Sequence, residues 1–410
     1  MDRLVFIGRL VILLQTITAE QSQKKLENIS DIHKKQFNKE PNWIIKAPGR
    51  INILGEHLDY NGGNVLPAGV NRHLFFTIGS SESETPLIDA FAIMTGERSI
   101  ISTQDKYNGW RAYFRGSLLA LEEEGYKLDR RVEVAFYGNI PLGAGMSSSA
   151  ALCCGLILGL SHTLGWGLDR KLIALLGQRA EHIIGANCGL MDQYAVLFSR
   201  KGHIIDLDCS SMETSLIPWK LKDTALVLVN SKVDHQLAGT GSIYNKRRAV
   251  CEKALNILKK DDSNLHFLAK ASLDQLESLK THFSKDDFAK VQYVIQEAQR
   301  VEKAKQAIFS GSAGDLGQLM YSTHEGLQHL FEVSVPETDL LVDIGRETDG
   351  VYGARMVGGG FGGCVLFLME ASTSKEAAKN IYESYLQKTG IDSPGFEVKI
   401  DNGISIAPAL

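Results

Sequence analysis

Residues 47–63 read APGRINILGEHLDYNGG, a stretch that sets Arg50, Glu56, His57 and Asp59 among several glycines and other turn-forming residues. So many charged side chains fit a hydrophobic core poorly, because buried charges need partners. They fit a small-ligand pocket well, because a guanidinium binds oxyanions and carboxylates accept hydrogen bonds from hydroxyls. The stretch therefore predicts a pocket for a hydroxyl-rich ligand, of which a sugar is the obvious example.

The length and composition of the chain are those of an ordinary globular protein. Its 410 residues, 44% hydrophobic and 22% charged, are enough for about two or three domains or one large unit of two lobes. The formal net charge of −4 argues against nucleic acid or an anionic membrane surface as the main partner. The six cysteines form no C-x-x-C pair, which favours a reduced, cytoplasmic protein. We take a monomer as the expected state.

The first 20 residues, MDRLVFIGRLVILLQTITAE, have the basic start, apolar stretch and small-residue end of a signal peptide. Arg9 interrupts the apolar run, and no part of it approaches the roughly 20 residues of a membrane-spanning helix. We favour an upstream extension or a mis-set start over secretion, because nothing further along the chain requires an oxidising compartment. We therefore assign residues 1–24 to an extension, whose status as a signal, a leftover extension or a mis-set start stays open.

Helical and strand-like segments alternate irregularly along the rest of the chain. Residues 147–164 are almost all small and apolar, which predicts a buried helix, and residues 170–184 have one apolar side. Residues 132–137 and 225–230 are typical of strands. Hairpin-like spacing in places favours an α+β protein in two lobes over a doubly wound parallel sheet. We place the boundary between the lobes near Asp206.

Residues 139–152 read NIPLGAGMSSSAAL and form a second motif. Gly143 and Gly145 allow a turn in which phosphate oxygens can approach the backbone, and three serines then open the buried helix. The start of a helix binds anions through its free N–H groups and its dipole, and a serine hydroxyl can ligate Mg²⁺. A Gly/Ser tract can also be a flexible linker, but the core helix that follows favours a phosphate-binding loop. No G-x-x-x-x-G-K-[ST] motif occurs, so this is not the usual NTPase loop.

A third glycine-rich stretch, VGGGFGG at residues 357–363, matches the dinucleotide-binding pattern G-x-G-x-x-G. In a dinucleotide-binding fold this pattern opens a helix, whereas here the strand-like sequence CVLFLM follows it. We therefore reject a dinucleotide-binding fold. Two interpretations stay open: a simple hairpin turn, and a glycine loop whose backbone packs against the floor of an active site.

Two acidic residues stand in the segment AEHIIGANCGLMDQY, residues 180–194. A single Asp or Glu is usually a solvated surface charge, and this is the default interpretation of Glu181. Asp192 differs, because its neighbours are apolar or aromatic and indicate partial burial. A buried carboxylate needs a partner, and Arg50 is the obvious candidate.

These motifs, in this order, resemble those of the GHMP small-molecule kinases, and residues 47–63 resemble the galactokinase signature within that superfamily. The segments GLMDQYAVLF and SIYNKRRAVCEKA are also similar to galactokinase segments that the wider superfamily does not share. The resemblance covers about residues 27–410. It implies an α+β, two-lobed GHMP kinase fold with the active site in the cleft. The N-terminal lobe, residues 25–206, would be of the ribosomal-protein-S5-domain-2-like type, and residues 207–410 would form a C-terminal α/β sandwich lobe.

The resemblance implies a sugar 1-kinase that converts galactose and MgATP to α-galactose 1-phosphate and ADP, as in galactose catabolism. Arg50 and Asp192 would flank the anomeric hydroxyl, with Asp192 as the candidate base and Arg50 orienting it and stabilising charge. Whether Asp192 removes the proton or mainly positions the hydroxyl stays open, because positioning and electrostatics carry most of phosphoryl transfer. Ser148 and Glu181 would hold the Mg²⁺ ion.

The nucleotide would lie on the second motif. Trp110 matches a family position that lines the adenine site, although a core tryptophan is an equally good interpretation. The other ATP-binding residues that the resemblance implies are Gly143, Gly145, Ser147, Ser148 and Ser149.

For the sugar, the resemblance implies that Glu56 and His57 lie near the C6 hydroxyl, and that Asp59 accepts from the C3 and C4 hydroxyls. Tyr244 would reach the axial C4 hydroxyl, and the backbone at Gly189 would close the pocket. His57 has a second interpretation, in which it only orients Glu56.

Other sugars and another class of protein are the alternatives. Leu58 stands where a threonine is common in the family, and we expect a packing change there rather than a lost ligand. Glu56 argues against galacturonate, because like charges repel. It also argues against arabinose, whose missing C6 hydroxyl would cost roughly 1–3 kcal/mol if Glu56 is buried; N-acetylgalactosamine stays open. A non-catalytic sugar and ATP sensor is disfavoured, because such sensors have a shortened serine/alanine loop and residues 147–151 here read SSSAA.

Overall fold

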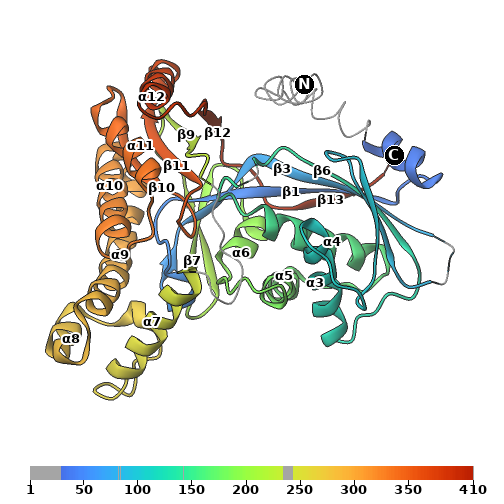
Figure 1. Ribbon diagram of the computed structural model, residues 1–410, viewed down its shortest axis with the longest axis horizontal. Helices are drawn as coiled ribbons and strands as arrows, with labels where there is room; N and C mark the ends of the chain where they lie inside the picture. The colour runs from blue at the N-terminus through green and yellow to red at the C-terminus, as the bar shows by residue number, and fades with distance from the viewer. Residues whose placement is uncertain (1–28, 82, 84, 142, 234–242, 410) are drawn as a thin grey trace.

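The computed structural model describes residues 29–81, 83, 85–141, 143–233 and 243–409 (Figure 1). The predicted extension at residues 1–24 lies outside these residues. Residues 29–37 are helical and precede the first strand. None of the helices in the described residues combines the length and apolarity needed to cross a membrane.

The first sheet has six strands in the order β13-β1-β3-β6-β4-β5, and its only parallel pair is β4 with β6. The pairing of β1 with β3 shifts register between Pro48 and Arg50. Such irregularities bend a strand and re-aim its side chains, and here the bend lies beside the predicted catalytic arginine. The strands are β1 (Trp43–Asn52), β3 (Pro67–Ser80), β4 (Ile88–Ala92), β5 (Glu97–Ile101), β6 (Val132–Gly138) and β13 (Ser405–Pro408).

Helices α3 to α6 cover one face of the first sheet (Figure 1). The predicted buried helix is α4, and nearly all of its residues are buried. Gly155 and Gly159 allow its close approach to the sheet, because a Cβ at either position would collide with Phe76 or Ile78. The helices are α3 (Trp110–Glu123), α4 (Ser148–Thr163), α5 (Arg170–Ile183) and α6 (Met191–Phe198).

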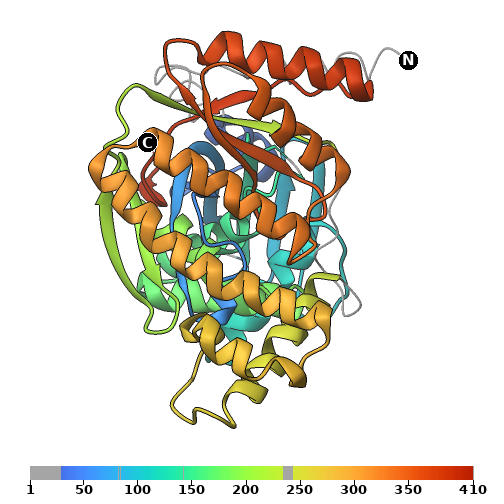
Figure 2. The same ribbon diagram turned by 90° about the vertical axis from the view of Figure 1, so that its left-hand side faces the viewer.

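The second sheet has four antiparallel strands in the order β10-β11-β9-β12. The long helices α9 and α10 lie side by side, and α10 and α11 pack on β10 (Figure 2). A separate hydrophobic cluster that includes Phe367 and Tyr385 packs between this sheet and its helices. The elements are β9 (Thr224–Asn230), β10 (Val351–Met356), β11 (Cys364–Glu370), β12 (Phe396–Val398), α9 (Lys285–Ser310), α10 (Ala313–His329), α11 (Pro336–Glu347) and α12 (Ser374–Thr389).

Smaller elements join the two sheets. A three-stranded sheet has the order β2-β7-β8, and α7 and α8 lie beside α9 at one end of the molecule (Figure 1). These elements are β2 (Asn64–Val65), β7 (His203–Asp208), β8 (Glu213–Pro218), α7 (Ile243–Leu258), α8 (Leu273–Ser278) and the 3₁₀ turns η1 (Asp59–Asn61), η2 (Leu268–Lys270) and η3 (Lys280–His282).

The path of the chain bears on the division into lobes. The boundary near Asp206 stays a prediction, but Asp206 lies within β7, whose sheet continues into β8. The last strand, β13, pairs with β1. The end of the chain therefore lies in the sheet formed by the N-terminal residues, although the sequence placed it in the C-terminal lobe.

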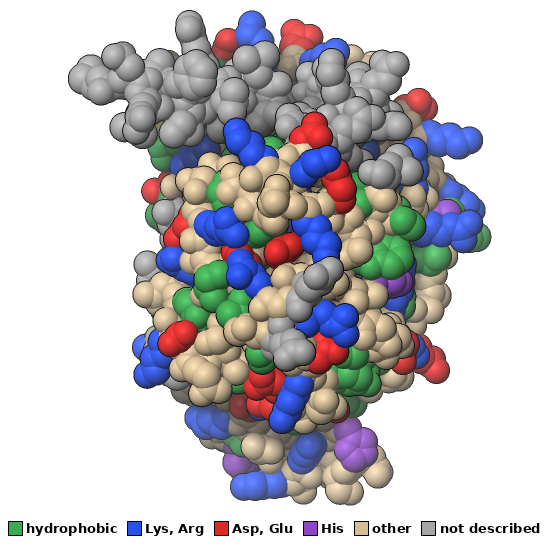
Figure 3. Space-filling model, turned by 90° about the vertical axis from the view of Figure 1, so that its right-hand side faces the viewer, with side chains coloured by type: hydrophobic (Ala, Val, Ile, Leu, Met, Phe, Trp, Pro, Cys, Tyr) green, Lys and Arg blue, Asp and Glu red, His purple; other side chains and the backbone are tan. Residues whose placement is uncertain are grey.

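Charged side chains are mixed by sign on the face shown in Figure 3, where basic and acidic groups alternate rather than gather. A nucleic-acid-binding face is usually a patch of basic residues. This face of the molecule has no such patch among the described residues.

Candidate active site

A cavity of about 460 Å³ opens where the three glycine-rich motifs meet. It is lined by the turn after β1, the loop before α4, the segment between α5 and α6, helix α7, and the loop between β10 and β11. Trp110 and Gly189 are not among its described lining residues. The predicted site residues that line it are Arg50, Glu56, His57, Asp59, Gly143, Gly145, Ser147, Ser148, Ser149, Glu181, Asp192 and Tyr244.

Arg50 on β1 and Asp192 in the first turn of α6 form an ion pair with two hydrogen bonds. Arg50 Nε donates to Asp192 Oδ1 at 2.8 Å, and Nη2 donates to Oδ2 at 3.0 Å. The Arg50 side chain is only 5% exposed, whereas that of Asp192 is 21% exposed. The predicted pairing is therefore confirmed, and the carboxylate is fixed at the wall of the cavity.

The loop before α4 adds two contacts to this pair. Arg50 Nη1 donates to the carbonyl of Gly145, and Ser147 Oγ donates to Asp192 Oδ2. Ser147 has a left-handed backbone with φ of 54°, which costs of order 1–3 kcal/mol for a residue other than glycine. Its hydroxyl points to the Asp192 carboxylate instead of capping the helix that starts at Ser148.

Glu181 on α5 is buried, so its default interpretation as a surface charge is wrong. Gln193 Nε2 donates to its Oε2, and burial raises the pKa of Glu181 to about 7. Ser148 lines the same cavity, so a hydroxyl and a carboxylate oxygen are available to a hard cation. Within the described residues, no group of three or more His, Cys, Asp or Glu could hold a metal ion. A cation here would therefore need ligand oxygens from elsewhere, such as phosphates.

Asp59 begins the 3₁₀ turn η1. Burial, with a smaller contribution from the charge of Asp192, raises the pKa of Asp59 to about 7. Gly189 packs directly against this side chain, because a Cβ on Gly189 would lie 2.9 Å from the Asp59 Cβ. The adjacent Leu58 stands where a threonine is common in the family, and it is fully buried in the main core. At such a position the difference between leucine and threonine is expected to change core packing. Gly189 thus leaves room for the Asp59 side chain, which lines the cavity.

His57 and Tyr244 form an aromatic wall with Tyr60. His57 Nδ1 lies 2.9 Å from the Tyr60 hydroxyl, and the Tyr244 ring lies 5.8 Å from that of His57. His57 Nε2 is buried without a hydrogen-bond partner among the described residues. Burial, and then the charges of Arg355 and Arg247, lower the pKa of His57 to about 3. The imidazole is therefore neutral at physiological pH.

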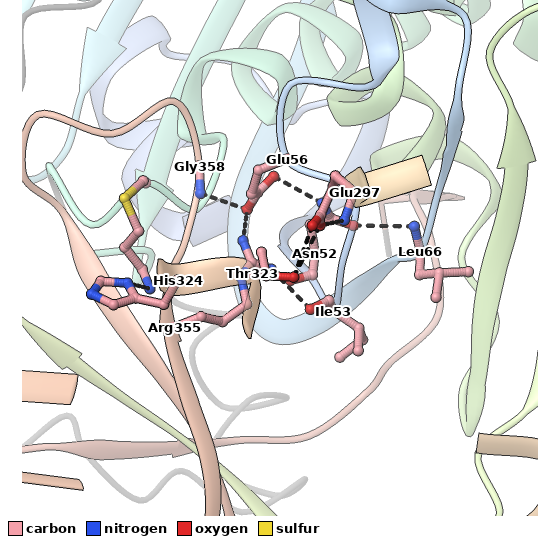
Figure 4. Close-up of polar contacts among 12 residues, drawn as sticks. Asn52, Ile53, Glu56, Leu66, Glu297, Thr323, His324, Arg355 and Gly358 are labelled. Carbon is pink, nitrogen blue, oxygen red and sulfur yellow. Dashed lines mark hydrogen bonds and ion pairs between the residues drawn. The ribbon is translucent and has the colours of Figure 1, made fainter. Parts of the chain in front are cut away.

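Glu56 is almost fully buried and is bound to the third motif. Its Oε1 accepts a hydrogen bond from the Gly358 N–H at 2.8 Å and forms an ion pair with Arg355 (Figure 4). Gly358 and Gly359 line the cavity in the loop between the antiparallel strands β10 and β11. Both open interpretations of the third motif therefore hold: it is a hairpin connection, and its backbone packs against the cavity. In the sequence, the one sign that Arg355 contributes to the site is its position just before the glycines of the third motif.

Trp110 lies apart from the cavity. Its ring packs against Phe114 and Phe136, and its Nε1 donates to Glu97 at 2.9 Å. Tyr113, which follows on the same helix, lines the cavity instead. Tyr113 lies three residues after Trp110 on α3, and this helical spacing is the sequence signal that could have pointed to it.

Three family profiles match the chain. The "Galactokinase galactose-binding signature" covers residues 31–80, "GHMP kinases N terminal domain" covers 112–200 and "GHMP kinases C terminal" covers 304–392. The galactokinase of Thermotoga maritima is 37% identical over 361 residues, which span 88% of this chain and 99% of that protein. This chain belongs to the galactokinase family. The family member from Clostridium perfringens, also a galactokinase, is 33% identical over 380 residues, or 90% of this chain and 96% of that protein.

Solved structures agree with this family. The Lactococcus lactis galactokinase, solved in complex with galactose, superposes with a TM-score of 0.87 at 27% identity, covering 93% of this chain and 99% of that one. The Methanococcus jannaschii mevalonate kinase shares the fold at 19% identity and a TM-score of 0.63, covering 88% and 99%. The predicted two-lobed, α+β GHMP kinase fold is confirmed.

Proposed function

We propose that this member of the galactokinase family transfers the terminal phosphoryl group of MgATP to the anomeric hydroxyl of galactose. The products are α-galactose 1-phosphate and ADP. The observation that carries the proposal is one cavity that joins the Arg50–Asp192 pair to the glycine and serine loop at the start of α4. The relatives named galactokinase and the galactose-bound L. lactis enzyme support it.

Asp192 is the proposed partner of the anomeric hydroxyl. Its carboxylate accepts the hydrogen bond of that hydroxyl and takes the proton as the oxygen forms its bond to phosphorus and the bond to ADP breaks. Arg50 fixes the carboxylate by two hydrogen bonds and places positive charge near the reacting oxygens.

The loop before α4 is the proposed site of the nucleotide phosphates. Gly143, Gly145 and Ser149 line the cavity beside the start of the helix, where free N–H groups and the helix dipole favour anions. Ser148 and Glu181 are the proposed protein ligands of Mg²⁺, and their oxygen donors suit this ion. When bound, Mg²⁺ supplies charge neutralisation on the phosphates.

The remaining polar groups of the cavity are proposed to select the sugar. Asp59 would accept from the C3 and C4 hydroxyls, and Tyr244 would reach the axial C4 hydroxyl. Glu56 and His57 would lie near the C6 hydroxyl. All four residues line the cavity, and Gly189 leaves room for Asp59.

A panel of sugars tests the proposed function. ATP consumption is measured with galactose, N-acetylgalactosamine, arabinose, galacturonate and glucose at equal concentrations. We expect the highest kcat/KM with galactose and very little turnover with galacturonate. Turnover of another sugar without turnover of galactose would refute the proposal.

We further propose that the protein works as a cytoplasmic monomer that binds only its small-molecule substrates. All six cysteines are free thiols, which suits a reducing compartment. Light scattering of the purified protein at working concentration measures the oligomeric state, and a stable dimer mass would contradict the monomer.

A further inference from the structure

Arg355 is a fully buried arginine in the strand that leads into the third motif. Its guanidinium reaches from β10 to the turn after β1 (Figure 4). Nη1 donates to the carbonyl oxygens of Asn52 at 2.7 Å and Ile53 at 2.9 Å, while Nη2 donates to Glu56 Oε1. One side chain from the C-terminal part of the chain therefore binds both the backbone and the carboxylate of the sugar signature.

The acceptor sites of Glu56 can be counted. Oε1 accepts from Arg355 Nη2 and from the Gly358 N–H, whereas among the described residues Oε2 accepts only from Asn52 Nδ2 at 2.8 Å. A carboxylate oxygen offers about two acceptor sites. Oε1 therefore has no acceptor site left, and the free site for a further donor is on Oε2.

Helix α9 fixes the same turn from another direction. Glu297, which is fully buried, accepts the Gly55 N–H at 2.8 Å. The Tyr293 hydroxyl donates to the backbone carbonyl of Glu56 at 3.1 Å. Since the backbone at residues 55 and 56 is held in this way, the orientation of the Glu56 carboxylate depends chiefly on Arg355, Gly358 and Asn52.

We propose that Arg355 is a positioning residue for sugar selection: it occupies one oxygen of Glu56 and turns the other toward the substrate. This inference rests on the proposed function and names how that function selects the C6 hydroxyl. A buried ion pair gives little net stability compared with an apolar pair of similar volume. A role in stability alone would therefore not require an arginine at this position.

The test compares galactose with 6-deoxygalactose, which lacks the C6 hydroxyl. Arg355→Lys replaces the planar fork of donors with a single ammonium. We expect the preference for galactose over 6-deoxygalactose, as a ratio of kcat/KM, to fall by roughly tenfold or more, while the ATP KM is unchanged. A residue that only stabilised the fold would lower kcat/KM for both sugars equally.

Two further variants complete the design. Arg346→Lys is the matched control, because Arg346 is 40% exposed and pairs with the exposed Glu325 on the surface, and it should leave the preference unchanged. If Arg355→Lys does not fold, the double variant Arg355→Met with Glu56→Gln carries no unpaired buried charge. It should fold and lose the same preference.

The outcomes separate the two proposals. A folded Arg355→Lys protein that keeps the wild-type preference would overturn the positioning role, as would a double variant that keeps it. A wild-type enzyme that phosphorylates neither galactose nor any other sugar of the panel would overturn the proposed function itself.

Discussion

A methyl group at Gly189 tests whether the position of Asp59 controls the affinity for the sugar. A Cβ on Gly189 would lie 2.9 Å from the Asp59 Cβ and closer still to its carboxylate. Non-bonded carbon atoms rest about 3.5–4.0 Å apart, so Gly189→Ala must displace the carboxylate by about 1 Å or more. Most of the displacement falls on the carboxylate, the free end of a side chain, although the Asp59 Cβ must also shift, and Gly189 is not among the residues with positive φ. The fold is therefore expected to survive.

The size of the effect follows from the bonds that Asp59 is proposed to make. Losing a hydrogen bond to a charged group costs about 1.5–3 kcal/mol, which corresponds to a rise of about 10- to 150-fold in the galactose KM. The ATP KM should not change, because the phosphate loop is not displaced. Asp59→Ala should raise the galactose KM by a similar factor, since both variants remove the same contact.

Steady-state kinetics decide the question. The release of ADP is followed with galactose varied at saturating ATP, and then with ATP varied at saturating galactose. Gly314→Ala is the matched control, because Gly314 lies in the first turn of α10 and a Cβ there would have no neighbour within 4 Å. A wild-type galactose KM in Gly189→Ala would refute the reasoning, as would an equal rise in the KM of both substrates.

Three further predictions concern single carboxylates. Asp192→Asn should lower kcat by ~10²–10³ while calorimetry finds ATP binding intact; near-normal turnover would contradict its proposed role. Burial raises the pKa of Asp59 to about 7, and only the carboxylate accepts from two hydroxyls, so the galactose KM should fall as the pH rises from 6 to 8. Asp59→Asn should remove this slope, and a slope that persists would assign it to another group. The hydrogen bond from His73 lowers the pKa of Asp401 well below its unfolded value, so the stabilisation from this carboxylate is present at neutral pH and declines progressively as the pH falls from about 4 toward the depressed folded pKa. Asp401→Asn should therefore lower the thermal midpoint more at pH 7 than at pH 3, and equal losses at both would exclude this hydrogen-bonded carboxylate as the cause.

Local sequence predicted the elements that carry the chemistry. The run of small and apolar residues after Ser147 predicted α4, and the structure starts that helix at Ser148. The strand-like residues after the third motif predicted a strand rather than a helix, and β11 begins at Cys364. Local sequence predicts these elements because periodicity and turn residues act over a few neighbours in the chain.

The pairing of Arg50 with Asp192 was predicted across 142 positions of sequence. The apolar neighbours of Asp192 indicate its burial, and a buried carboxylate needs a partner. Glu181 has no comparable sign in its neighbours, and its burial is evident only in the structure. Trp110 remains a candidate from family resemblance, although the cavity is lined by Tyr113 instead.

The sequence by itself determined the family, the signature turn and the residues able to bind a sugar and a phosphate, because these depend on residue types at short spacing. The tertiary structure alone decided which groups orient them. Arg355 meets Glu56 across 299 positions, and the last strand returns to pair with β1. Contacts at such separations are set by how the two sheets and their helices pack, and no local pattern encodes that packing. In the folded protein, the buried Arg355 therefore occupies one carboxylate oxygen of Glu56, and the other oxygen keeps a free acceptor site for the substrate.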